Sequence, residues 1–115
     1  MKKKIAIVSF LILLFGSCYY DKADPVPVCN NVNAEWTRDV QPIILSKCAT
    51  SSCHSGAVYI GDYTTYEGLK PFLDNGHFKM RVFDLNIMPP VTSTPLTGEQ
   101  YMQLKCWYES GYPEN

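Results

Sequence analysis

Two thiols and an imidazole lie close together in the middle of the chain, on Cys48, Cys53 and His54. Two thiols can form thioethers with the vinyl groups of a haem, and an imidazole directly after the second thiol can reach the iron from the same side. These residue types therefore predict the attachment of a c-type haem. Two residues usually separate the thiols, whereas four separate them here, so the intervening loop must bulge to keep both sulfurs at the porphyrin edge.

Three other interpretations of the same side chains stay open. Cys48 and Cys53 could form a disulfide that closes the loop and leaves His54 exposed. Together with His54 and His77 they could instead bind zinc, although exported thiols tend to oxidise first and adjacent ligands crowd a single ion. In the third interpretation neither thiol has a role, which is the least favoured outcome for an exported chain rich in cysteine.

The distal ligand of such a haem is predicted at Met88. An iron with one histidine takes a ligand on its other face, and a methionine thioether there raises the potential into the electron-transfer range. Met88 directly precedes two prolines, which stiffen the chain and exclude a helix, so its position does not depend on helix packing. The alternatives are Met80, Met102 and His77, the last of which would give a bis-histidine haem.

The N-terminus is predicted to be a lipoprotein signal peptide, residues 1–17. Residues 2–4 are all lysine and residues 5–15 carry no charge, but this run is shorter than the roughly 20 apolar residues that a membrane span needs. Small residues stand directly before Cys18, as in the bacterial lipobox. We therefore expect Cys18 to be the acylated first mature residue, held stably by two or more acyl chains. The alternative is ordinary cleavage nearby, with Cys18 as a spare thiol.

The mature chain divides into a tether, residues 18–33, and one domain, residues 34–115. Two prolines, three asparagines and the lack of a helical or strand period are typical of a tether. The whole chain has a net charge of −1, and because the first 17 residues hold three lysines and no acid, the remaining 98 carry about −4. This balance excludes a polybasic nucleic-acid binder, which needs a surplus of Lys and Arg.

The elements that must position these groups are predicted to be helices. Residues 35–48 should form the first one, with Asp39 as its N-cap and Pro42 in its first turn, where a missing N–H costs little. The following stretch, residues 49–63, is rich in Ser, Gly and Thr and is expected to be a loop.

A short second helix is predicted at residues 64–74, with Thr64 or Thr65 as its N-cap and Gly76 just past its end. Residues 86–97 contain three prolines and are expected to be irregular.

The last helix has the clearest signals, a capping box at residues 97–100 and a natural stop at Gly111. Its apolar side chains gather within about 60° of one face; they are Tyr101, Leu104, Trp107 and Tyr108. We expect this face to pack against the haem together with Ile43, Ile44 and Leu96.

A disulfide between Cys29 and Cys106 is predicted from the cysteine count. Of the five cysteines, lipid attachment uses one and haem attachment two, which leaves this pair in an oxidising compartment. On the last helix Cys106 lies about 200° from Leu104 and so faces away from the apolar stripe, where the tether residue Cys29 could pass over it. The alternative is that Cys106 is a small buried side chain and Cys29 pairs between molecules.

The order of short motifs along residues 35–115 runs through Asp39 to Ile44, Cys48, Cys53, His54, Tyr63, Tyr66, Met88, Pro89, Leu96, Glu99, Trp107, Gly111 and Asn115. This order resembles single-haem cytochrome c domains, most closely the small lipoprotein type of Bacteroidetes and the related planctomycete-type domains. The resemblance implies an all-α, small class I cytochrome c-like fold with long loops and one covalent haem between the first and last helices. By the same resemblance Cys48 and Cys53 attach the haem. His54 would be its proximal ligand and Met88 its distal one.

The function expected from these features is that of a membrane-anchored c-type cytochrome, which carries single electrons between redox partners in the cell envelope. With histidine and methionine both bound, the iron would have no free position for a substrate. We therefore expect that the protein is not an enzyme. The acidic domain, expected to be a monomer, would suit a basic docking face on a redox protein. The periplasmic side of either membrane, or the cell surface, would hold the anchor. The competing expectation is a haem-free, disulfide-stapled lipoprotein that serves as an interaction module.

Overall fold

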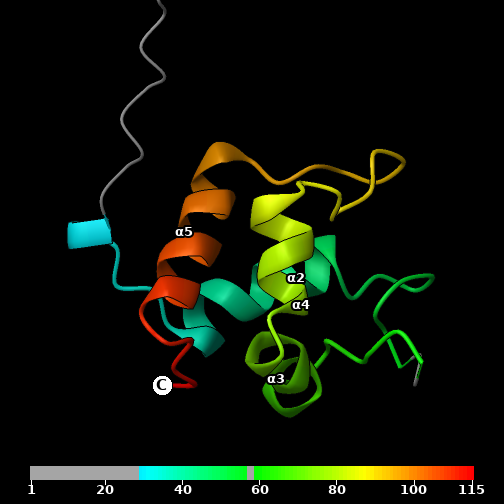
Figure 1. Ribbon diagram of the computed structural model, residues 1–115, viewed down its shortest axis with the longest axis horizontal. Coiled ribbons are helices and arrows are strands. Elements are labelled where there is room, and N and C mark those ends of the chain that lie inside the picture. Colours follow the sequence, from blue (N-terminus) through cyan, green and yellow to red (C-terminus); the bar gives the residue numbers. More distant parts are fainter. Residues whose placement is uncertain (1–28, 57–58) are drawn as a thin grey trace, which may run out of the picture.

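The part of the chain that this computed structural model describes, residues 29–56 and 59–115, winds through short helices joined by long loops (Figure 1). No strand occurs within these residues, so the all-helical prediction is confirmed at the level of fold class. Within the same two ranges, no helix is both long enough and apolar enough to cross a bilayer. The predicted signal peptide and Cys18 lie outside the described residues.

The first helical segment begins as a π-helical turn, η3 (Trp36–Val40), and continues directly as α2 (Gln41–Lys47). The predicted segment is therefore present, but Asp39 lies inside it and is not its N-cap. Its carboxylate instead reaches back one turn, where it accepts a hydrogen bond from the Glu35 N–H at 2.9 Å and pairs with Arg38 at 2.8 Å. These hydrogen bonds, from Arg38 first, hold the pKa of Asp39 below its ordinary value.

The second predicted helix is α3 (Tyr66–Asp74), and Thr65 caps it by accepting a hydrogen bond from the Gly68 N–H at 3.1 Å. Gly68 is required inside this helix because a side chain there would collide with the backbone carbonyl of Asp62. The glycine thus lets α3 press directly against the end of the preceding loop. Pro71 is tolerated within the helix, which continues for three further residues.

A further helical segment was not predicted from the sequence. It consists of α4 (His77–Lys79) and the π-helical turn η4 (Met80–Asp84), which follow one another without a break. Phe78 and Val82 are buried one helical turn apart, so this segment lays an apolar face against the rest of the domain. Gly76, with φ of +77°, makes the left-handed turn that separates the segment from α3.

The last helix, α5 (Gly98–Glu109), begins and ends as predicted. The Thr97 hydroxyl accepts from the Gln100 N–H at 3.2 Å, and the Gln100 side chain accepts from the Thr97 N–H at 3.0 Å. Gly111 follows the helix with φ of +92°. In Figure 1 this helix stands at the left of the domain, and the loop segments 48–56, 59–63 and 85–97 extend on the other side.

The hydrophobic core gathers where η3, α2, α3 and α5 meet. Trp36 and Trp107 form its centre, with ring centroids 5.7 Å apart, and the Trp107 indole N–H donates to the Pro113 carbonyl at 2.8 Å. This hydrogen bond satisfies a buried donor and fixes the C-terminal segment at the same time. The other buried members include Val40, Ile43, Ile44, Leu69, Leu73, Phe78, Val82 and Leu104.

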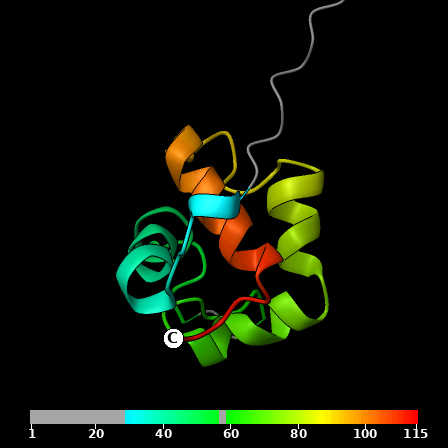
Figure 2. The ribbon, with the colours of Figure 1, turned by 90° about the vertical axis from the view of Figure 1, so that its left-hand side faces the viewer.

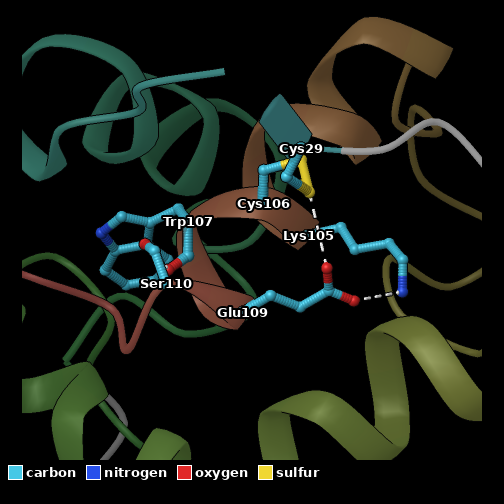
Figure 3. The surroundings of a disulfide bond; sticks show 6 residues. All are labelled: Cys29, Lys105, Cys106, Trp107, Glu109 and Ser110. Atoms are coloured by element: carbon cyan, nitrogen blue, oxygen red, sulfur yellow. Dashed lines mark hydrogen bonds and ion pairs between the residues drawn. A yellow bond between two sulfur atoms is a disulfide. The ribbon is translucent and has the colours of Figure 1, made fainter. Parts of the chain in front are cut away.

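Cys29 and Cys106 are at disulfide distance, with Cα atoms 5.4 Å apart, inside the limit of about 7 Å for a bridged pair (Figure 3). Figure 2 shows the short turn η2 (Cys29–Asn31) lying across α5. Cys106 therefore faces away from the core as predicted, yet only 2 % of its surface is exposed. The bridge joins residues 77 positions apart in the sequence, and so connects the segment before η3 to the last helix.

Candidate functional site

A pocket of about 410 Å³ opens among the two long loops and the α4–η4 segment. This volume lies in the range of about 300–1,000 Å³ that is usual for ligand and cofactor sites. Its lining residues are Lys47, Cys48, Ser52, Cys53, His54, Ile60, Tyr63, Phe72, His77, Phe78, Arg81, Val82, Met88, Pro89 and Pro90. The fold therefore brings Cys48, Cys53, His54 and Met88 to one place, although Met88 is far from the other three in sequence.

The four-residue loop between the cysteines is closed by backbone hydrogen bonds. The Cys48 N–H donates to the Ile44 carbonyl at 2.8 Å, which carries the last turn of α2 up to the first thiol. The Cys53 N–H then donates to Thr50, and the His54 N–H returns to the Cys48 carbonyl at 3.1 Å. The extra residues are thus absorbed in a turn, which joins the backbone of His54 to that of Cys48.

Both cysteines of this loop are free thiols in the structure, so the alternative of a disulfide between them is not what the fold contains. Burial raises the pKa of Cys48 to about 12, and the nearby Cys53 adds to the shift. The neutral thiol of Cys48 is therefore the stable form at physiological pH. Among the residues that the structure describes, no group of three or more His, Cys, Asp or Glu side chains is arranged to hold a metal ion, as the zinc alternative would require.

His54 presents one ring nitrogen to the protein. Its Nδ1 lies 2.7 Å from the Ile60 carbonyl and 3.3 Å from the Gly61 carbonyl. A carbonyl oxygen can only accept, so Nδ1 carries a proton here, and in the neutral imidazole Nε2 then has the lone pair. A hydrogen bond of this kind orients metal-binding histidines and fixes their tautomer, and here it leaves Nε2 as the nitrogen that can bind iron.

Gly61 makes this arrangement possible. It is buried, and its φ of +90° favours glycine. A Cβ at this position would lie 2.5 Å from the Phe72 ring and 2.7 Å from the Tyr63 ring. The glycine therefore allows the loop to pass directly under both rings while its backbone faces His54.

Met88 is held by the end of η4. The N–H groups of Ile87 and Met88 both donate to the Arg81 carbonyl, at 3.0 and 3.2 Å, and Asn86 makes the turn with φ of +52°. Met88 is half-buried and packs against the core cluster. Its place is thus set by backbone hydrogen bonds outside any helix.

The other candidates for the distal ligand separate into two groups. Met80, in η4, and Met102, in α5, do not line the pocket, whereas His77 does. His77 is exposed at the start of α4. The structure therefore leaves Met88 and His77 as the two candidates in position.

The expected packing of the last helix against the haem is not what the structure contains. No residue of α5 lines the pocket; Leu104 and Trp107 are buried in the core with Ile43 and Ile44, and Leu96 packs against that core. The apolar walls come instead from Ile60 and Phe72 and from the α4–η4 segment, through Phe78 and Val82. The prediction was correct that the face of α5 with Leu104 and Trp107 is buried. It was wrong that this face lines the haem pocket, because the protein core covers it.

Among the described residues, the charged side chains that line the pocket are Lys47 and Arg81, with no carboxylate beside them. The pocket is thus locally positive within a chain of negative net charge, and it suits a ligand that is largely apolar and bears acidic groups. Sequence reasoning missed both cations and also Tyr63, Phe72, Phe78 and Val82 as pocket residues. The spacing of Phe78 and Val82, one helical turn apart, was the one local signal that could have indicated this wall.

No protein-family model, curated protein or solved structure matches the chain.

Proposed function

We propose that this chain is a c-type cytochrome that carries single electrons, with one haem held covalently in the pocket. The observation that carries the proposal is the meeting of Cys48, Cys53, His54 and Met88 in one mostly apolar pocket, with the Nε2 lone pair of His54 left free. These are the two thiols, the imidazole and the thioether that such a group requires.

The residues of the pocket fit this group in three respects. Cys48 and Cys53 would form the thioether bonds, and the turn between them keeps His54 beside Cys48. His54 would bind the iron through Nε2, because Nδ1 is engaged by the Ile60 carbonyl. Lys47 and Arg81 supply two positive charges for the two propionates of a haem.

The reaction class follows from the ligand set. A haem iron supplies one-electron chemistry by changing between two oxidation states. His54 and Met88 on its two faces would leave no position for a substrate, so the protein would transfer electrons and not act as an enzyme. The apolar walls would exclude water, and a thioether ligand from Met88 would raise the potential.

The setting proposed for this activity is the cell envelope. Cys18 would anchor the chain by its acyl groups, and the tether would let the domain reach a redox protein. Contacts between such partners are small and short-lived, and the acidic chain favours a basic face on the partner. We expect Cys18→Ala to lose the acyl label and to leave the membrane fraction.

The experiment that tests the proposal is the comparison of His54→Ala with His77→Ala in cells that mature c-type cytochromes. We expect His54→Ala to lose most of its holoprotein and its low-spin spectrum, because no other pocket imidazole has its Nδ1 held by a carbonyl. His77→Ala should keep both. A wild-type spectrum in His54→Ala would contradict the proposed proximal ligand.

The distal ligand is tested in the same way by Met88→Ala, with Met80→Ala as the matched control outside the pocket. Loss of the weak far-red thioether–iron(III) band in Met88→Ala alone would support Met88. If the wild type lacks that band and His77→Ala alters the low-spin spectrum, the distal ligand is His77.

A further inference from the structure

Tyr63 lies flat against the imidazole of His54. The two ring centroids are 3.9 Å apart, and their planes differ by only 2°. The Tyr63 N–H also donates to the His54 carbonyl at 2.8 Å, so the two residues are joined through both backbone and rings. This is the closest and most nearly parallel aromatic contact found among the described residues.

The Tyr63 ring is itself fixed from behind. It is 8 % exposed and meets the Phe72 ring of α3 edge to face, with centroids 5.2 Å apart. Gly61 passes so close beneath the ring that even a Cβ there would touch it. The orientation of the Tyr63 ring is thus set by α3 and by the loop. Because the two rings stack, the Tyr63 ring in turn restricts the orientation of the His54 imidazole.

The hydrogen bond of His54 to Ile60 does not fix the imidazole plane by itself. The bond determines the tautomer and one point of the ring, but the terminal torsion of histidine is broad, and the ring can tilt about that point. A parallel ring at van der Waals distance removes this freedom. The hydrogen bond and the stacked ring together hold both the direction of Nε2 and the plane of the imidazole.

We propose that Tyr63 is a positioning residue for the proximal ligand, which sets the plane of the His54 imidazole relative to the bound haem. This inference rests on the proposed function. The plane matters because the π orbital of an imidazole overlaps one of the iron d orbitals in preference to the other. The orientation would therefore contribute to the magnetic anisotropy of the oxidised iron and to its potential.

The test compares the oxidised holoproteins of the full chain by electron paramagnetic resonance and by the haem-methyl NMR shifts. Tyr63→Phe retains the flat ring and should give the wild-type g values and methyl shifts. Tyr63→Leu removes the ring and should give changed or broadened g values and a different spread of methyl shifts. Tyr66→Leu is the matched control, because Tyr66 packs on Trp36 and does not line the pocket; its spectra should match the wild type.

Should Tyr63→Leu fail to fold, Tyr63→Met and Phe72→Leu give the same comparison, since the first lacks a flat ring and the second removes the support behind it. Folded, haem-bearing variants with wild-type g values and methyl shifts would overturn the role of Tyr63 and leave the proposed function standing.

If the wild type itself binds no haem, the proposed function fails, and the haem-free chain still decides whether Tyr63 positions His54. The His54 ring protons should be shifted upfield by the Tyr63 ring current in wild type and Tyr63→Phe, and should move downfield in Tyr63→Leu. Identical His54 shifts in all three would overturn the inference.

Discussion

The side of the domain that carries α5 differs from the side that carries the pocket in how it is closed. Around α5 the side chains fill the interior, and Ile44, Leu104 and Trp107 have no exposed surface. On the pocket side, buried Tyr63, Phe78 and Val82 form part of the wall. The loops that carry His54 and Met88 are held by backbone hydrogen bonds, and these two residues are only half-buried. The α5 side is filled by packed side chains, whereas on the other side the loops surround the pocket.

This difference indicates a division of roles. The packed side can stabilise the domain without contributing to the chemistry, because no residue of α5 lines the pocket. The loop side can hold reactive groups because glycine turns and carbonyl acceptors position them there. Substitutions on the two sides should accordingly separate stability from cofactor binding.

The largest effect on stability is expected from Trp107→Ala. This residue is fully buried, and its loss should lower the free energy of unfolding by about 3–5 kcal/mol. Denaturant unfolding measures the change, and Tyr59→Ala, at a residue that is 90 % exposed, is the control with an expected change within about 0.5 kcal/mol. A Trp107→Ala protein with unchanged stability that has lost the haem spectrum would contradict the division of roles between the two sides.

Removal of the disulfide comes next. The double variant Cys29→Ala with Cys106→Ala should be less stable by about 2–4 kcal/mol, since the bridge restricts a loop of 77 residues in the unfolded chain. Folded variant protein should contain as much haem as the wild type. Mass spectrometry of unreduced tryptic peptides checks the pairing itself, and free thiols at both positions would rule the bridge out.

On the pocket side, Gly61→Ala is compared with Gly56→Ala. Both glycines have positive φ, +90° and +82°, but only Gly61 has rings within reach of a new Cβ. Gly61→Ala should therefore cost about 1–3 kcal/mol more than Gly56→Ala through the clash with Phe72 and Tyr63. It should also lower the haem content, because the clash displaces the backbone that faces His54. Equal stability and equal haem content in the two variants would show that the close approach of Gly61 to the two rings is not needed for folding or for haem binding.

The effect that is smallest at neutral pH is carried by Cys48 in the haem-free chain, because it develops only at high pH. Its pKa is raised by burial from 9.0 to about 12, so the fold favours the protonated thiol. The resulting stabilisation is fully present below about pH 9 and is lost as the pH rises towards 12. Denaturant unfolding of wild type and Cys48→Ala should thus differ in pH dependence only above pH 9. The difference should vanish in the holoprotein, where a thioether cannot titrate; its persistence there would mean that Cys48 is not attached.

The helix ends were predictable where the signal is local. The capping box at Thr97 and the turn at Gly111 depend on neighbouring residues, and both are present in the structure. Asp39 was assigned wrongly because the chain is already helical before it, through a π-helical turn in which Trp36 and Val40 are buried. The α4–η4 segment escaped prediction because it is short and only Phe78 and Val82 mark its buried face.

The candidate site was predictable in its residue types and not in its surroundings. Chemistry singled out Cys48, Cys53, His54 and Met88, and the fold places them in one pocket. The hydrogen-bond partner of His54 could not be predicted from the sequence. It is the backbone carbonyl of Ile60, and every residue type has such a carbonyl. Periodicity showed that Leu104 and Trp107 are buried, but it could not tell a core from the wall of a pocket.

The central claim, a haem attached to Cys48 and Cys53, is tested most directly by acid–acetone extraction of the full chain after expression with a c-type cytochrome maturation system. We expect a red protein that keeps one haem per chain through the extraction, as measured by intact mass and the pyridine haemochrome spectrum. The double variant Cys48→Ala with Cys53→Ala should have none attached. A colourless wild-type protein, or a haem that the solvent removes, would contradict the account and favour a haem-free interaction module.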